Sequence, residues 1–151
     1  VYYKCPTLCN FHLNGVGKVF KSLDWNMGEN FTYVALSMDP AEGPELALQK
    51  RNAYEKDYTA SGNRPAGGWN FLTGKEESIK ALTSQLGFHY KWNPGNGQWI
   101  HPSVVYILTP DGKISRFFNG IEFSATDLKL ALVEASDGKI GTFLDKAALF
   151  C

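Results

Sequence analysis

The stretch Val1-Tyr2-Tyr3-Lys4-Cys5-Pro6-Thr7-Leu8-Cys9 decides the fold class, because it combines a strand end, a helix start and two cysteines. The segment from Val1 to Tyr3 is short, aromatic and β-branched, which predicts the end of a strand. Pro6 suits the first turn of a helix, where its missing N–H costs no hydrogen bond. The two cysteines are therefore expected where a strand gives way to a helix.

Outward from this stretch, the hydrophobic pattern predicts an alternation of helices and strands. Leu13, Val16, Phe20 and Leu23 recur at helical spacing and predict one apolar face of a first helix. Further helices are predicted over residues 44–58, 75–86 and 125–135, with Ser124 as the cap of the last. Strands are predicted over 31–38, 103–108 and 113–118, and irregular loops over 61–68 and 91–100.

The predicted order β-α-β-α-α-β-β-α indicates an α/β protein of the thioredoxin-like type. A βαβ half, with parallel strands and a right-handed crossover, precedes a ββα half, and one helix is inserted between them. The second half is a hairpin turned at Pro110-Asp111-Gly112. We expect one central mixed sheet, made of residues 1–3, 31–38, 103–108 and 113–118, with helices on its faces. No glycine-rich phosphate loop follows the first strand, which disfavours a nucleotide-binding fold.

Composition is that of an ordinary globular domain. The chain has 151 residues, of which 44% are hydrophobic and 20% are charged, so a single domain over residues 1–151 is expected. Fifteen basic residues balance fifteen acidic ones, and this zero net charge argues against a nucleic-acid partner. No run approaches the roughly 20 apolar residues of a membrane span, and no signal peptide is visible. Because the chain starts abruptly within a predicted strand, we expect a fragment, with any targeting or anchoring segment lying outside it.

The cysteines are the first candidates for chemistry. There are three, Cys5, Cys9 and Cys151, too few for a disulfide scaffold. Residues four apart on a helix share a face, about 6 Å apart, within reach of a disulfide. A helix start also stabilises a thiolate. Reversible disulfide exchange, soft-metal binding, or both therefore stay open for Cys5 and Cys9. Alternatively, Cys9 is a core residue on the apolar stripe, and Cys151 has no assigned role.

A metal site would need a further ligand, and the three histidines are the main candidates. His101 stands just before the strand at residue 103, in a loop that would pack against the start of the first helix in a thioredoxin-like fold. It would then face the cysteines despite the long separation in sequence. His12 lies on the same side of the first helix as the cysteines and competes for this role. His89 is expected to be structural or exposed. Copper and zinc both accept such donors.

Longer motifs carry a resemblance to a known family. They are Cys5-Pro6-Thr7-Leu8-Cys9, Ser37-Met38-Asp39-Pro40, Gly68-Trp69-Asn70-Phe71-Leu72-Thr73-Gly74, and His101 ahead of Val105-Tyr106-Ile107-Leu108-Thr109-Pro110-Asp111-Gly112. With these motifs the chain resembles the Sco/SenC copper proteins from residue 1 to about residue 134. The resemblance implies one copper ion, Cu(I) or Cu(II), bound by Cys5, Cys9 and His101. It also implies a membrane-tethered domain outside the cytoplasm, in a bacterial periplasm or cell envelope rather than a mitochondrial intermembrane space.

The function that this resemblance implies is that of a metallochaperone. Such a protein helps to assemble the dicopper centre of cytochrome c oxidase subunit II, and we expect a monomer without turnover chemistry. The alternative is a thiol-disulfide oxidoreductase that uses Cys5 and Cys9 as a redox pair on the cysteines of that subunit or of other envelope proteins. The spacing favours the chaperone, because three residues separate the cysteines where common thioredoxin-type sites have two. A peroxidase is disfavoured by the close cysteine pair.

The chain departs from the family pattern at three positions. Ile100 stands directly before the histidine, where an acidic residue is common. Gly43 lies where an acidic residue often follows the Asp-Pro turn, and Pro102 stands where a serine or threonine is usual. None of these departures removes an expected ligand.

Overall fold

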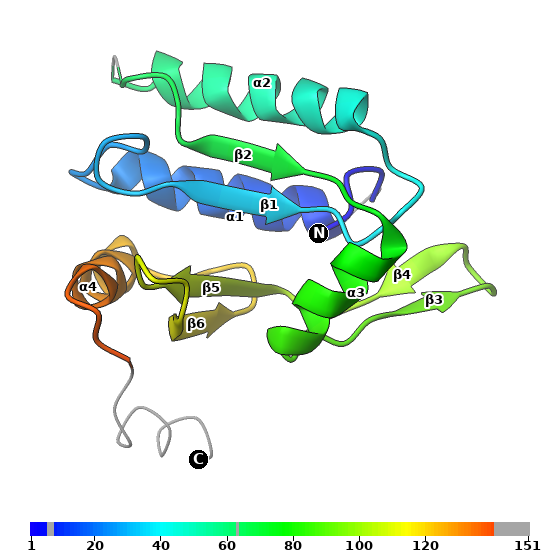
Figure 1. The fold of residues 1–151 in the computed structure, drawn as a ribbon. Helices are drawn as coiled ribbons and strands as arrows, with labels where there is room; N and C mark the ends of the chain where they lie inside the picture. The colour runs from blue at the N-terminus through cyan, green and yellow to red at the C-terminus, as the bar shows by residue number, and fades with distance from the viewer. Residues whose placement is uncertain (6–7, 63, 141–151) are drawn as a thin grey trace.

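The computed structural model describes residues 1–5, 8–62 and 64–140. This part of the chain holds four helices and three two-stranded pairs (Figure 1). In chain order the elements are α1 (Leu8–Ser22), β1 (Tyr33–Leu36), α2 (Pro44–Ala60), β2 (Trp69–Leu72), α3 (Glu76–Gln85), β3 (Lys91–Asn93), β4 (Gln98–Ile100), β5 (Val104–Leu108), β6 (Ile114–Asn119) and α4 (Ala125–Ser136). The four predicted helices are confirmed within a few residues of their expected ends.

The first half of the chain forms a parallel strand pair covered by helices. β1 pairs with β2 in a register that places Tyr33 opposite Trp69, and α2 is the crossover between them. The strand β2 was not predicted from the sequence, although Trp69 and Phe71 are buried and alternate with exposed neighbours, the pattern of a half-buried strand. Pro44 is the first residue of α2, and Gly43 is its N-cap. Proline is favourable at this position, because its missing N–H would have no partner within the helix.

The second half holds two antiparallel hairpins. β5 and β6 confirm the hairpin predicted around Pro110-Asp111-Gly112, where Gly112 has a φ of +82° and the Thr109 N–H donates to Lys113 at 2.8 Å. β3 and β4 form a second hairpin, with Trp92 opposite Trp99, in the segment that was expected to be an irregular loop. In Figure 1 this second hairpin projects beside α3, away from the other strands.

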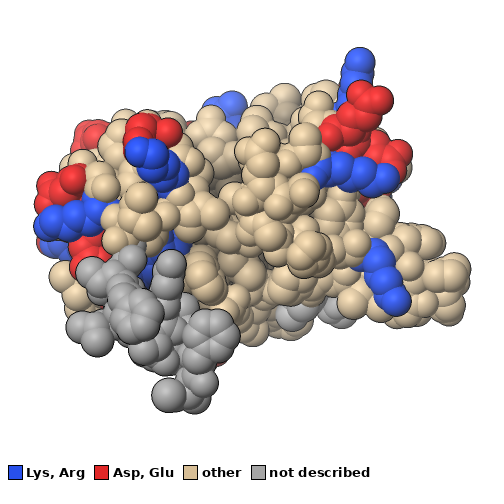
Figure 2. All heavy atoms as spheres, turned by 60° about the horizontal axis from the view of Figure 1, so that its bottom comes forward, with Lys and Arg blue, Asp and Glu red and all other residues tan. Residues whose placement is uncertain are grey.

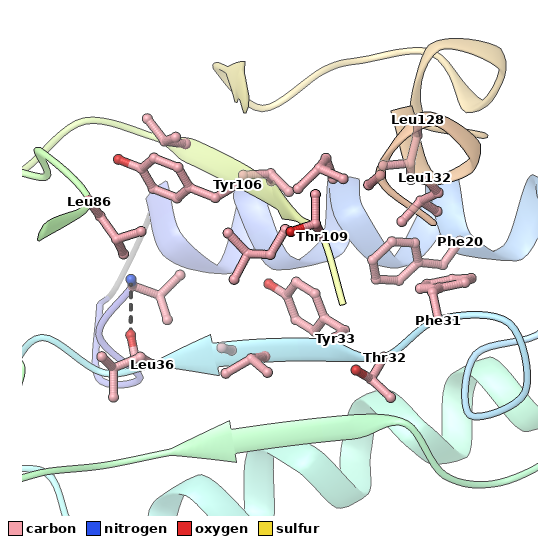
Figure 3. Close-up of a pocket in the computed structure, with 18 of the residues that line it drawn as sticks. Phe20, Phe31, Thr32, Tyr33, Leu36, Leu86, Tyr106, Thr109, Leu128 and Leu132 are labelled. Carbon is pink, nitrogen blue, oxygen red and sulfur yellow. Dashed lines mark hydrogen bonds between the residues drawn. The ribbon is translucent and has the colours of Figure 1, made fainter. Parts of the chain in front are cut away.

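The expectation of one continuous sheet was wrong. β1–β2 and β5–β6 form separate sheets, and a cavity of about 740 Å³ lies between them, lined by side chains such as Tyr33 and Tyr106 (Figure 3). Residues 1–3 were expected to form a strand, but they form none, and the backbone bonds to the end of β1 come from Val1. Its N–H donates to Leu36 at 3.4 Å and its carbonyl accepts from Met38 at 2.9 Å, a parallel arrangement. The chain then turns at residues 3–4, so it places no strand between β1 and β5.

The core is rich in aromatic rings and rests on the predicted face of α1. Leu13, Val16, Phe20 and Leu23 are all buried, as their spacing indicated. The ring of Phe20 packs edge-on to Tyr33 and Trp69, which joins α1 to the β1–β2 pair. This packing fixes the direction of α1 and thereby the position of its N-terminal end.

The charged side chains are mixed rather than grouped by sign on the face shown in Figure 2. Basic and acidic residues lie together near two edges of this face, with uncharged surface between them. Several form exposed ion pairs, such as Lys80 with Glu76 on α3 and Lys129 with Asp24. Within the described residues, the model contains no helix that has both the length and the apolar character needed to cross a membrane.

Candidate metal centre

The candidate centre lies where the N-terminal segment meets the start of α1. Cys5 is buried, at 5% exposure, in a small apolar cluster with Tyr2, Met38 and Ile79. The Cys5 N–H donates to the Tyr2 carbonyl at 3.3 Å, which closes a tight turn before the helix. Cys9 is the second residue of α1, so both cysteines flank the helix start as predicted. The side chain of Cys9, the residues Pro6 and Thr7, and Cys151 lie outside the described part of the chain.

His101 reaches the same region from a point 96 residues after Cys5 in the chain. It directly follows β4, and its ring meets the ring of Tyr2 edge-on, with the centroids 5.9 Å apart. The ring of Phe88 also packs on the His101 ring, with the centroids 6.3 Å apart. Tyr2 therefore contacts His101 and also belongs to the cluster that contains Cys5. The structure thus brings these two predicted ligands to the same aromatic residue.

The imidazole of His101 is in a suitable form for metal binding. Its Nδ1 lies 2.8 Å from the carbonyl oxygen of Pro102, so Nδ1 is the protonated nitrogen and the lone pair is on Nε2. Burial lowers the pKa of His101, and the Val1 ammonium lowers it further, whereas the bond to Pro102 raises it. A neutral imidazole with one nitrogen oriented by a carbonyl is the arrangement that metal-binding histidines commonly show.

His12 has a different role from His101. It is buried, and its Nδ1 lies 2.7 Å from the Ser103 hydroxyl, which itself donates to the Gly120 carbonyl at 3.1 Å. Burial lowers the pKa of His12 to about 4, the Val1 ammonium and His101 lower it too, and a hydrogen bond to the Gly120 backbone opposes this. His12 therefore braces the loop that follows His101. His89 is exposed, as expected.

Glu42 was missed by the sequence analysis. This carboxylate is buried beside the candidate centre and accepts hydrogen bonds from the backbone N–H groups of Tyr3 and Lys4. Its only signal in the sequence was its position just after the Ser37-Met38-Asp39-Pro40 motif, because its partners lie far away along the chain. Within residues 1–5, 8–62 and 64–140, no three His, Cys, Asp or Glu side chains form a group able to hold a metal ion. The expected set also includes the Cys9 side chain, which that description does not cover.

Comparison with known proteins gives one consistent result. The family model described as SCO1/SenC matches residues 1–134. A SCO1 protein homolog of Bacillus subtilis (strain 168) is 26% identical over 132 residues, which are 84% of this chain and 63% of the relative. The chain thus spans less than two thirds of the length of that curated relative.

Two solved structures illustrate the similarity of fold. A SCO1/SenC family lipoprotein from Bacillus anthracis str. Ames superimposes with a TM-score of 0.68 and 23% identity, covering 89% of this chain and 77% of that one. Arabidopsis thaliana ScoI, solved with copper bound, superimposes with a TM-score of 0.65 and 20% identity, covering 91% and 80%. These similarities confirm the predicted thioredoxin-like fold class, although the sheet is divided into separate pairs in this chain.

Proposed function

This chain belongs to the SCO1/SenC family, and from that premise we propose that it binds one copper ion through Cys5, Cys9 and His101. The observation that carries the proposal is the position of Tyr2, which packs in the cluster of Cys5 and against the ring of His101. Because Tyr2 belongs to the cluster of Cys5 and also contacts His101, donors from two distant parts of the chain could hold an ion from different directions.

The donor set suits copper on chemical grounds. Thiolates are soft donors that favour Cu(I), and an imidazole extends the site to Cu(II). Cys5 and Cys9 would supply the thiolates at the start of α1, where the helix dipole stabilises negative charge. Nε2 of His101 would supply the imidazole lone pair. The copper that occupies ScoI of Arabidopsis thaliana supports the same cargo for this chain.

We further propose that the cargo is delivered to the dicopper centre of cytochrome c oxidase subunit II, in an extracytoplasmic compartment to which a membrane tether holds the protein. Two exposed apolar side chains beside the ligands support a protein partner: Phe11, two residues after Cys9, is 64% exposed, and Ile100, next to His101, is 51% exposed. The lipoprotein from Bacillus anthracis supports the tether.

Thiol-disulfide exchange with the same partner is the second candidate, favoured by the position of the cysteine pair at a helix start. Exchange requires a thiolate to attack a sulfur of the substrate disulfide in line, so the attacking sulfur must be accessible. The burial of Cys5 limits the access of that sulfur as the attacking thiolate, so exchange stands second to copper binding.

The decisive experiment is metal analysis of the reduced protein after loading with equal copper and zinc. We expect one copper per chain, because in the reduced protein the two soft thiolates favour Cu(I). The matched control is the Cys5→Ser/Cys9→Ser double variant, which should retain its fold by circular dichroism and lose the copper. Equal copper in both proteins would overturn the proposal.

A further inference from the structure

Glu42 is a buried acidic residue that the proposed ligand set does not use. Its side chain is 4% exposed and lies between β1 and α2, directly before Gly43, the N-cap of α2. Acidic side chains are rarely buried, because removing a carboxylate from water is costly unless hydrogen bonds replace the lost hydration. The hydrogen-bond partners of Glu42 therefore indicate what it does.

Three donors converge on this carboxylate. The Tyr3 N–H donates to Oε2 at 2.7 Å, and the Lys4 N–H donates to Oε1 at 2.6 Å. The Ser37 hydroxyl donates to Oε2 at 2.5 Å. Hydrogen bonds to an ionised acceptor are shorter and about twice as strong as neutral ones. The carboxylate thus clamps the turn at residues 3–4 onto the end of β1, and the next residue in the chain is Cys5.

The segment after β1 is folded so that Glu42 points back to this turn. The Asp39 carboxylate accepts from the Ala41 N–H at 2.9 Å, and the Asp39 carbonyl accepts from the Glu42 N–H at 3.1 Å. The Ser37 hydroxyl also accepts from the Asp39 N–H at 3.1 Å. The Ser37-Met38-Asp39-Pro40 motif therefore does more than end a strand, because it builds the turn that presents Glu42.

We propose that Glu42 is the positioning residue for Cys5, which it holds in place through the backbone of Tyr3 and Lys4; this inference rests on the proposed copper site. Without the carboxylate, the buried N–H of Tyr3 and the partly buried N–H of Lys4 would lose their acceptor, and the turn that carries Cys5 would open.

The test compares Glu42→Gln with Glu45→Gln, a matched change of an exposed acid three residues further on. In Glu42→Gln the new side-chain amide would present its NH₂ group to one of the two backbone donors, so at least one bond is lost. In the reduced, metal-free proteins, the rate of Cys5 alkylation by iodoacetamide is followed by mass spectrometry. We expect Glu42→Gln to raise this rate about tenfold, as the loss of a charge-assisted hydrogen bond allows, and Glu45→Gln to leave it unchanged. Equal rates in all three proteins would overturn the proposal.

The same variants are then loaded with copper. We expect Glu42→Gln to bind Cu(I) about tenfold more weakly and to shift its thiolate-to-Cu(II) absorption, as is usual when the support of a ligand is removed. Wild-type protein without that absorption would contradict the proposed function, while the alkylation rates would still decide the role of Glu42. If Glu42→Gln does not fold, Ser37→Ala serves instead. It removes one of the three donors and should raise the alkylation rate about threefold, and no rise would count against the clamp.

Discussion

The two sides of the candidate copper site are held by different kinds of interaction. The thiol arm (residues 1–5) is tied to the body of the protein by the buried carboxylate of Glu42, through two backbone N–H groups. The imidazole arm (residues 100–103) depends on ring contacts of His101 with Tyr2 and Phe88 and on its local bond to Pro102. The thiol arm is fixed by short charge-assisted bonds, whereas the His101 ring is held by ring contacts and its bond to Pro102, and the loop after it is braced by the bond of Ser103 to His12.

This difference indicates how the site could hold and release its cargo. Charge-assisted hydrogen bonds fix both distance and direction, whereas edge-on ring contacts tolerate small displacements because they gain only about 0.5–1.5 kcal/mol each. We expect the thiolates to keep their positions and the imidazole to engage or withdraw. Cu(I) would then depend mainly on the thiol arm, and Cu(II) on both arms.

The largest expected effect is a loss of stability at low pH, when His12, which braces the imidazole arm, takes up a proton. In the folded protein the pKa of His12 is lowered to about 4 from the ordinary 6.5, so the unfolded chain binds a proton at a higher pH than the folded one. The free energy of unfolding should therefore fall as the pH drops from 6.5 to 4, by about 3 kcal/mol in total, and this histidine should add no pH dependence above 7.5.

Urea denaturation from pH 4 to pH 8 tests this prediction. His12→Gln keeps a side chain able to bond Ser103 but cannot take up the proton, so its stability should depend less steeply on pH between 4 and 6.5. Other titrating groups are the same in both proteins and cancel in the comparison. Parallel curves for the two proteins would show that His12 is not the buried neutral group described here.

A smaller effect is expected from Tyr2→Leu, which alters the contact between the two arms. Leucine retains an apolar side chain beside Cys5 but loses the edge-on contact with His101. Loss of one aromatic pair should weaken Cu(II) binding about fivefold while leaving Cu(I) affinity nearly unchanged. Competition with chelators selective for each oxidation state measures both affinities.

The matched control for that change is Tyr90→Leu, since the ring of Tyr90 packs on Phe88 and Trp99 in the same part of the molecule. It should alter neither affinity by more than about twofold, because the ring contacts of His101 with Tyr2 and Phe88 both remain. If Tyr2→Leu weakened Cu(I) and Cu(II) equally, the distinction between a fixed and an adjustable arm would be lost.

Local patterns predicted the elements whose signals are local. The buried face of α1, with Leu13, Val16 and Phe20, followed from helical spacing, and the β5–β6 hairpin followed from its Pro-Asp-Gly turn. The β3–β4 hairpin was missed because its strands are only three residues long and its Trp92 is exposed, so no apolar alternation marked them. The Gly97 turn, with a φ of +65°, was the available signal.

Features that depend on distant contacts could not be predicted in this way. The divided sheet occurs together with a turn at residues 3–4, and that turn is held by Glu42, which lies 38 residues after Lys4. The role of His12 likewise depends on Ser103, which is separated from it by 91 residues. For the candidate site, the resemblance identified the expected ligands, whereas the structure was needed to find the supporting residues Glu42 and His12. The ligand assignment itself remains a prediction.

The most direct test of the central claim is the thiolate-to-copper charge-transfer absorption of a histidine series loaded with Cu(II). We predict that His101→Ala loses or strongly shifts this band and weakens Cu(II) more than Cu(I), because both thiolates remain. His89→Ala, which removes an exposed histidine, should give the wild-type spectrum. An unchanged band in His101→Ala, or a band lost only when His12 is replaced, would contradict the assignment of Cys5, Cys9 and His101 as the copper ligands.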